Sequence, residues 1–135
     1  MNAMKYTSIT ENHLFHKAFA KGEKFVGRFV AVYILPDFTA KKRMRANPKK
    51  EYINRLGISV SKKLGGAVVR SRVRRIVREG YRTANNNGTV KKGRLIVVAA
   101  RSASVKAKST EVGAELCRAF SELGLYSSNQ AQDNV

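Results

Sequence analysis

The feature that most constrains this chain is the segment 67–84, which predicts a long helix with two chemically different sides. At about 100° per residue, one side carries only apolar residues and a glycine: Val69, Val73, Ile76, Val77 and Gly80. The remaining arc carries one acid, Glu79, and six arginines: Arg70, Arg72, Arg74, Arg75, Arg78 and Arg82. Such a helix requires a hydrophobic core against its first side and leaves the second side exposed.

The arginine side indicates a polyanionic partner. Arg70, Arg74 and Arg78 repeat at four-residue intervals, where like charges repel by roughly 0.2–0.5 kcal/mol per pair. RNA phosphates opposite them would relieve that repulsion, and a guanidinium can grip a phosphate with two hydrogen bonds. Lys62 and Lys63 precede the helix, whose N-terminal end itself attracts anions. The alternative is a solvated basic side that only keeps the protein in solution.

The remaining segments predict two more helices and three strands. Ser8 and Glu11 form a capping-box pattern that opens a first helix with the stripe Leu14, Phe15, Ala18 and Phe19, ending at Gly22. Strands are expected at 28–35, 53–61 and 94–100, the last buried on both sides. A final helix is expected at 109–123, with Gly124 after its end and Leu125 packing back on its last turn.

The resulting order is αββαβα, with room for a short extra strand, and it predicts an α+β fold with one small mixed sheet packed against helices. Residues 1–126 are expected to form a single domain. The basic stretch 41–51 is expected to be an exposed loop, and residues 127–135 a frayed C-terminal tail.

The charge balance favours nucleic acid as the partner, with an anionic membrane surface second. The 135 residues include 27 Lys and Arg against 9 Asp and Glu, for a net charge of +18. The chain has neither a membrane-length apolar run nor a signal-peptide core, so we expect a cytoplasmic protein. A single cysteine, Cys117, agrees with a reducing compartment.

No set of residues predicts a protein active site, and we expect neither catalytic nor metal-binding residues. His13 and His16 lie on the first helix without a matching Cys or carboxylate cluster, so they read as exposed surface residues. Cys117 has no obvious partner base, and the pair Gly65-Gly66 is far too short a pattern for a nucleotide-binding loop. If the assembly performs chemistry, the reacting groups belong to another component.

Residues 59–79, SVSKKLGGAVVRSRVRRIVRE, resemble the signature of the bacterial ribonuclease P protein family. The resemblance extends to Phe15, Phe19 and Gly22 in the spacing F-x-x-x-F-x-x-G, to the strand from Phe29 to Tyr33, and to Ala100-Arg101. It implies an α/β sandwich with a left-handed βαβ crossover, as in a ribosomal protein domain of the same fold. It also implies a catalytic RNA partner that uses Mg²⁺ to hydrolyse the 5′ leader from precursor tRNA.

The resemblance also assigns roles to particular residues. The implied RNA-facing residues are Lys62, Lys63, Arg70, Ser71, Arg72, Arg74, Arg75 and Arg78, and the implied leader-binding cleft, between the first helix and the sheet, contains Phe15, Phe19 and Tyr33. Spacing alone favours a core position for the two phenylalanines.

Two features depart from the family pattern. Ser71 replaces the asparagine of R-N-R, which puts any contact made by that amide in doubt. The 41–50 loop is also longer and more basic than expected. Two alternative functions remain: a structured-RNA-binding protein without chemistry, such as a ribosomal protein, and a protein-only nuclease.

Overall fold

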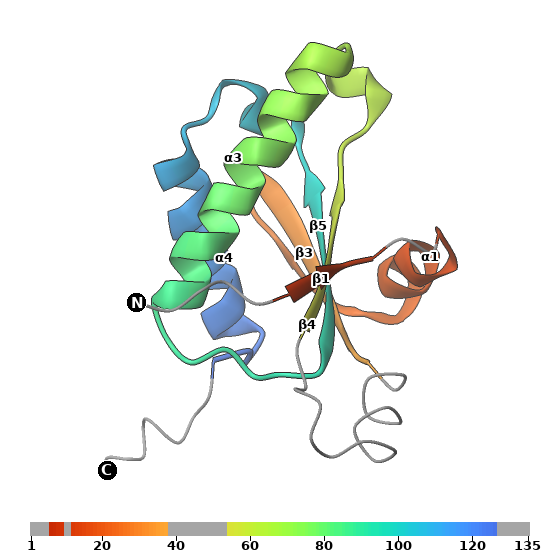
Figure 1. The fold of residues 1–135 in the computed structure, drawn as a ribbon, viewed down its shortest axis with the longest axis vertical. Coiled ribbons are helices and arrows are strands. Elements are labelled where there is room, and N and C mark those ends of the chain that lie inside the picture. The colour runs from red at the N-terminus through yellow and green to blue at the C-terminus, as the bar shows by residue number, and fades with distance from the viewer. Residues whose placement is uncertain (1–5, 10–11, 38–53, 127–135) are drawn as a thin grey trace.

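The computed structural model describes residues 6–9, 12–37 and 54–126 (Figure 1). The strands are β1 (Tyr6–Ser8), β2 (Glu23–Val26), β3 (Val30–Pro36), β4 (Asn54–Ser59) and β5 (Arg94–Ala100). The helices are α1 (Asn12–Lys21), α3 (Ala67–Asn86) and α4 (Ser109–Glu122), with short 3₁₀ helices η1 (Lys62–Leu64) and η2 (Ser102–Lys106). The predicted basic loop and C-terminal tail lie outside the described residues.

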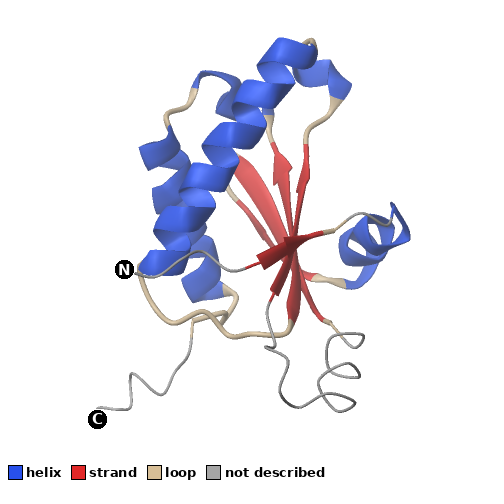
Figure 2. Cartoon of the chain, in the orientation of Figure 1, coloured by secondary structure: helices blue, strands red, loops and turns tan. Residues whose placement is uncertain are grey.

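One mixed sheet separates two helical layers. Its order is β1-β4-β5-β3-β2, with β4 parallel to β1 and β5, and β3 antiparallel to β5 and β2. Helices α3 and α4 cover one face and α1 covers part of the other (Figure 2). Viewed from the α3 side with β4 and β5 pointing up, β5 lies to the left of β4 (Figure 1), so the β4–α3–β5 crossover is left-handed, against the usual rule.

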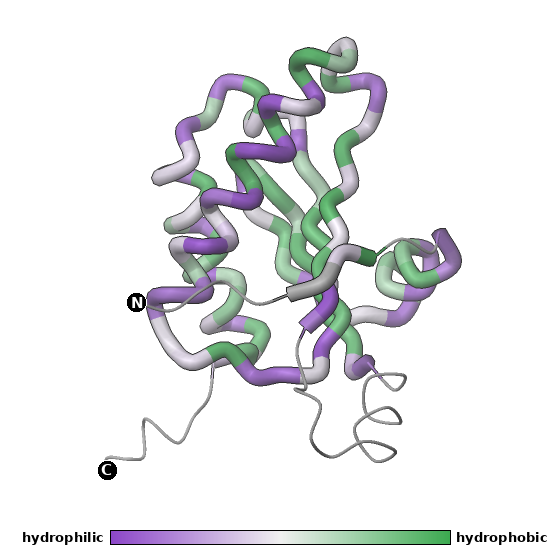
Figure 3. Tube along the Cα trace, in the orientation of Figure 1, coloured by the Kyte–Doolittle hydropathy of each residue, from purple (hydrophilic) through white to green (hydrophobic). Residues whose placement is uncertain are grey.

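The main core lies between the sheet and the α3/α4 layer. Hydrophobic residues are frequent along the strands and recur along both helices (Figure 3). Its completely buried members include Val32, Val98, Val77, Leu116 and Phe120. A smaller cluster lies on the other face, made of Ile9, Leu14, Ala18, Leu95 and Val97. Within the described part of the chain, the sheet is therefore sealed on one face and only partly covered on the other.

Most of the predicted elements are confirmed. The strand at 94–100 has the predicted residues, and the long helix begins at Ala67 as predicted but continues to Asn86. Gly124 has a φ of 70°, and the Leu125 N–H donates to Phe120 O at 2.8 Å, which confirms the predicted end of the last helix.

Two predictions at the N-terminal side are wrong. Ser8 does not cap the first helix, because it lies in β1 and pairs with Leu56 of β4, and the helix begins at Asn12. The strand predicted at 28–35 begins only at Val30, because residues 27–29 form the turn that follows an unpredicted strand, β2. Strand β2 lies at the sheet edge and exposes most of its side chains, so it leaves no alternating apolar pattern to read.

Candidate nucleic-acid interface

Helix α3 presents the arginines predicted for its outer side. Val73, Ile76, Val77 and Gly80 are buried and Val69 is half-buried, as predicted. Arg72, Arg75, Arg78 and Arg82 are exposed, as are Ser71 and Glu79, whereas Arg70 and Arg74 are half-buried. The guanidinium-rich side is therefore accessible along most of the helix.

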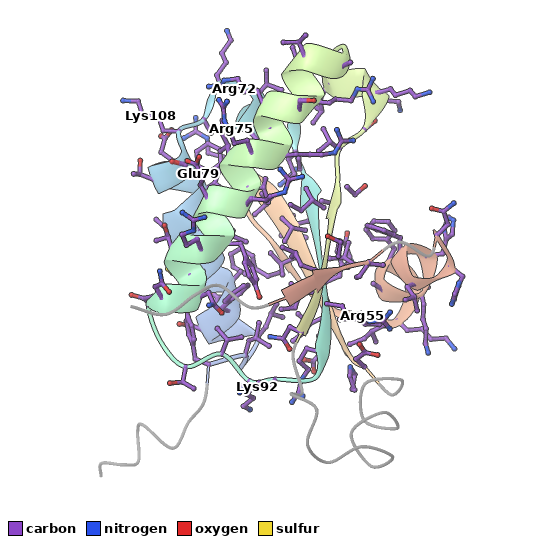
Figure 4. All side chains as sticks on the ribbon, viewed as in Figure 1. Arg55, Arg72, Arg75, Glu79, Lys92 and Lys108 are labelled. Atoms are coloured by element: carbon purple, nitrogen blue, oxygen red, sulfur yellow. The ribbon has the colours of Figure 1, made fainter. Side chains whose placement is uncertain are left out.

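Four of the six arginines of α3 form two pairs that line different hollows. Arg72 and Arg75 line a hollow of about 650 Å³ together with Ala67, Val68 and Ser71. They lie on the side of α3 that faces the segment around Lys108 (Figure 4). Arg74 and Arg78 instead line a hollow of about 200 Å³, which is also lined by Phe15 of α1. The periodicity of the sequence, by contrast, predicts one continuous surface for all the arginines of this helix.

Arg72 is partly occupied by contacts within the chain. Its Nη1 donates to the carbonyl of Val105 at 2.6 Å and its Nη2 to that of Ala107 at 3.5 Å. Arg70 donates from Nε to Gly65 O at 3.2 Å, at the start of the same helix. A guanidinium has five N–H donors, so both residues retain donors for a partner. Arg72 nevertheless also holds the segment that follows β5.

Lys62 and Lys63 lie in η1, immediately before α3, and both are exposed. The Lys63 N–H donates to Ser61 Oγ at 3.2 Å, which caps this short turn. The two lysines therefore add their charge at the N-terminal end of α3, where the helix dipole also favours anions.

The three predicted cleft aromatics lie together on the α1 side of the sheet. The rings of Phe19 and Tyr33 meet edge to face, with centroids 5.0 Å apart. Phe15 packs on Gly57 of β4, where an added Cβ would lie 2.6 Å from Phe15 Cζ. Phe15 and Tyr33 are half-buried and Phe19 is 40% exposed. These rings therefore form an accessible aromatic surface rather than a sealed core.

The 200 Å³ hollow connects the aromatic surface with the arginine helix. Phe15 of α1 and Gly57 of β4 line it together with Arg74 and Arg78 of α3. Ser8 and Ile9, at the end of β1, complete its lining with Leu56 and Ile58. We call this set of residues the aromatic–arginine groove. The sequence could not reveal it, because its members are far apart in the chain and meet only when β1 pairs with β4.

A buried acid that the sequence did not predict shapes the turn between β2 and β3. Glu115 of α4 is 5% exposed, and its carboxylate accepts hydrogen bonds of 2.8 Å from the backbone N–H groups of Arg28, Phe29 and Val30. Gly27 leaves room for it, since an added Cβ would lie 2.4 Å from the carboxylate carbon. The signal was an acid beside Leu116 in the apolar stripe of the last helix.

A second buried acid joins two strands near α1. Asp37, 1% exposed, accepts from Arg55 Nε at 2.7 Å and from Arg55 Nη2 at 3.0 Å. This two-point contact ties the end of β3 to β4 across the sheet. Arg55, labelled in Figure 4, therefore has a structural role in addition to its charge.

The other residues considered for chemistry are dispersed. His13 and His16 are exposed on α1, as predicted, and Cys117 is half-buried in α4. Across residues 6–9, 12–37 and 54–126, no three His, Cys, Asp or Glu side chains gather where they could hold a metal ion. None of the helices in these ranges is both long and apolar enough to cross a bilayer.

A mixed sheet with an arginine-bearing crossover helix and an adjacent aromatic groove defines the class of small RNA-binding α+β proteins. Comparison with known proteins identifies the family. Residues 4–124 match the family model of ribonuclease P. The chain is 35% identical over 122 residues to the ribonuclease P protein component of Clostridium acetobutylicum, covering 90% of this chain and 92% of that protein. It therefore belongs to the ribonuclease P protein family.

Further relatives agree with this assignment. The ribonuclease P protein component of Clostridium botulinum is 33% identical over 123 residues, covering 91% of this chain and 99% of that protein. The RNase P protein of Staphylococcus aureus has a similar structure, with a TM-score of 0.69 at 25% identity, covering 91% of this chain and all of that one. That of Thermotoga maritima has a TM-score of 0.58 at 26% identity, covering 77% and 86%. The chain is thus a protein subunit of the ribonucleoprotein that matures the 5′ end of tRNA.

Proposed function

We propose that the chain holds the single-stranded 5′ leader of precursor tRNA in the aromatic–arginine groove while α3 binds the catalytic RNA. The observation that carries this proposal is the groove itself, which Phe15 lines together with Arg74 and Arg78. A nucleotide in such a groove can stack its base on an aromatic ring while its phosphate meets a guanidinium. Phe19 and Tyr33 extend the aromatic surface along α1 for the next bases.

The two interactions differ in how they contribute to affinity. Stacking on an aromatic side chain contributes about 1–3 kcal/mol per base. Phosphate contacts make affinity depend on salt, with a logarithmic slope of about 0.7 per neutralised phosphate for a single strand. Arg75, Lys62 and Lys63 lie outside the groove and are exposed, so we assign them to the RNA subunit.

Ser71 belongs to the same proposed RNA-facing surface. It is exposed and lines the 650 Å³ hollow beside Arg72 and Arg75. A serine hydroxyl reaches less far and offers fewer hydrogen bonds than the amide of the family pattern. We infer that a phosphate contact at this position depends chiefly on the two arginines beside it.

We assign the hydrolytic step, and the Mg²⁺ that it uses, to the RNA subunit. Mg²⁺ requires a compact set of oxygen ligands, and the described part of this chain gathers no such set. The two buried carboxylates among the described residues are already engaged, Glu115 by backbone N–H groups and Asp37 by Arg55. The chain thus assists by binding and orienting the substrate. We also assign the protein to the cytoplasm, as a subunit of an enzyme that acts on precursor tRNA.

The decisive experiment is reconstitution with the catalytic RNA encoded by the same genome. Added protein should increase the turnover of leader-bearing precursor tRNA at low Mg²⁺, where phosphate repulsion between the RNAs is strongest. Tight RNA binding without any increase in turnover would instead favour a ribosomal-type RNA-binding protein. An arm with protein alone tests the nuclease alternative, which requires cleavage without RNA that is lost in His13→Ala or His16→Ala.

A further inference from the structure

We propose that a second RNA-binding surface lies at the end of the sheet where β4 and β5 terminate. It is formed by Arg28, Lys63 and Lys106. This inference rests on the proposed function, because it takes the RNA subunit as the partner. The three cations come from three separate segments: the turn between β2 and β3, η1, and η2. Of the three, only Lys63 is predicted from the sequence to face RNA. We call these residues the edge surface.

The topology brings the three segments together at one end of the strands. Val30, at the start of β3, pairs with Ala100 at the end of β5, and Ser59, at the end of β4, pairs with Ala99. The segments that follow β4 and β5 and precede β3 therefore meet there, at the top of the molecule in Figure 1. They surround a hollow of about 450 Å³ lined by Arg28, Lys63, Leu64, Ser102, Ala103, Val105 and Lys106.

The charge of this hollow suits an RNA backbone. Arg28, Lys63 and Lys106 are exposed, and none of the seven lining residues is acidic. The nearest buried acid, Glu115, points its carboxylate to three backbone N–H groups of the turn. Three cations around one hollow repel one another, and phosphates between them would remove that repulsion.

The turn that carries Arg28 is held by contacts that leave the Arg28 side chain exposed. Glu115 accepts from the backbone N–H groups of residues 28–30, and the Arg101 guanidinium donates to the Gly27 carbonyl. The Arg28 guanidinium lies 5.4 Å from the centroid of the Phe29 ring, which limits its motion further. A cation fixed before binding loses less conformational entropy when it meets a phosphate.

The segment that carries Lys106 is fixed in a similar way. Arg72 donates to the carbonyls of Val105 and Ala107, on either side of Lys106. The buried Ser104 hydroxyl donates to Arg101 O at 2.6 Å. Arg72 is therefore a positioning residue for the edge surface, and it links that surface to the arginine side of α3.

The edge surface and the aromatic–arginine groove have no lining residue in common. Two separate RNA segments can therefore bind at once. The edge surface has cations but no aromatic ring in its lining, so it suits the phosphates of a folded RNA rather than the bases of a single strand. The structured RNA subunit fits this chemistry better than the leader does.

The test compares two double variants of the full chain. Arg28→Ala with Lys106→Ala removes two charges from the edge surface and keeps the backbone contacts to Glu115. Lys91→Ala with Lys92→Ala removes the same charge just before β5, at the opposite end of the strands, where Figure 4 labels Lys92. Equilibrium binding is measured against salt with two probes: the transcribed RNA subunit and a short single-stranded leader oligonucleotide.

We expect the edge variant to bind the RNA subunit roughly tenfold more weakly than the control variant, with a salt slope smaller by about 1 to 2. Its affinity for the oligonucleotide should match that of the control. Equal affinities of both variants for the RNA subunit would overturn the edge surface, as would a loss confined to the oligonucleotide. Failure of the wild-type chain to bind the RNA subunit at all would instead contradict the proposed function.

Discussion

The two faces of the sheet carry side chains of the same strands but differ in how completely helices cover them. Along β5, Ile96 and Val98 point into the large core beneath α3 and α4, whereas Leu95 and Val97 point into the small cluster beneath α1. The first face is closed by two long helices. Of the described helices, only the ten-residue α1 covers the second face, and aromatic rings remain half-exposed beside it. Stability is thus concentrated on one face, which leaves the other free to bind.

The largest expected effect is a loss of stability on the closed face. Phe120 is completely buried, and its ring meets those of Tyr81 and Tyr126 edge to face at 5.9 and 5.8 Å. Phe120→Ala should lower the free energy of unfolding by about 3–5 kcal/mol through cavity formation. Chemical denaturation provides the measurement. A loss no larger than that of Phe19→Ala would remove the distinction between the faces.

Next in size is the buried acid that anchors the β2–β3 turn to α4. Glu115→Ala leaves three backbone N–H groups without their acceptor, and should cost about 2–4 kcal/mol of unfolding free energy. Glu115→Gln is the matched control, because it keeps one side-chain oxygen and should recover part of the loss. Equal stability of the alanine variant and the wild type would mean that water replaces the carboxylate.

On the open face the expected loss is in binding rather than in folding. Phe19→Ala should weaken the affinity of the reconstituted enzyme for leader-bearing precursor tRNA by about 1–3 kcal/mol, the contribution of one stacked base. Its affinity for mature tRNA should stay the same. Equal losses for the two RNAs, or a large fall in thermal stability, would assign this ring to the core instead.

The smallest expected effect separates two arginines of α3. Arg72→Ala should reduce the free energy of unfolding by about 1 kcal/mol, because the guanidinium contacts carbonyls of the segment after β5. Arg75→Ala, at another exposed position of the same helix, should stay within about 0.5 kcal/mol of the wild type. Both should weaken RNA binding. Equal stabilities would mean that the contacts of Arg72 add nothing to the fold.

The elements that the sequence predicted are those whose burial leaves a periodic pattern. Helix α3 was predicted because its buried stripe repeats along the helix, and β5 because it is buried on both sides. Strand β2 exposes most of its side chains at the sheet edge, and β1 is three residues long, so neither produced a pattern. Local pattern therefore predicted the core but missed the edge strands.

For the candidate site, the sequence predicted the residue types but not their arrangement in space. The arginines and the aromatic residues were identified from the sequence as separate sets. Their meeting through Phe15, Gly57 and Arg78 depends on contacts between segments far apart in the chain, which periodicity does not encode. The internal contacts of Arg72 and the anchoring role of Glu115 are likewise tertiary. Charge and residue type indicated the partner, whereas the geometry of binding required the fold.

The most direct test of the central claim is a double-mutant cycle across the aromatic–arginine groove. Phe15→Ala, Arg78→Ala and the double variant are compared in the reconstituted enzyme by their affinity for precursor tRNA with and without its leader. If one strand contacts both residues, the leader-dependent losses should be non-additive by at least about 0.5 kcal/mol. Additive losses, or equal losses for tRNA without a leader, would contradict a leader strand bound between α1 and α3.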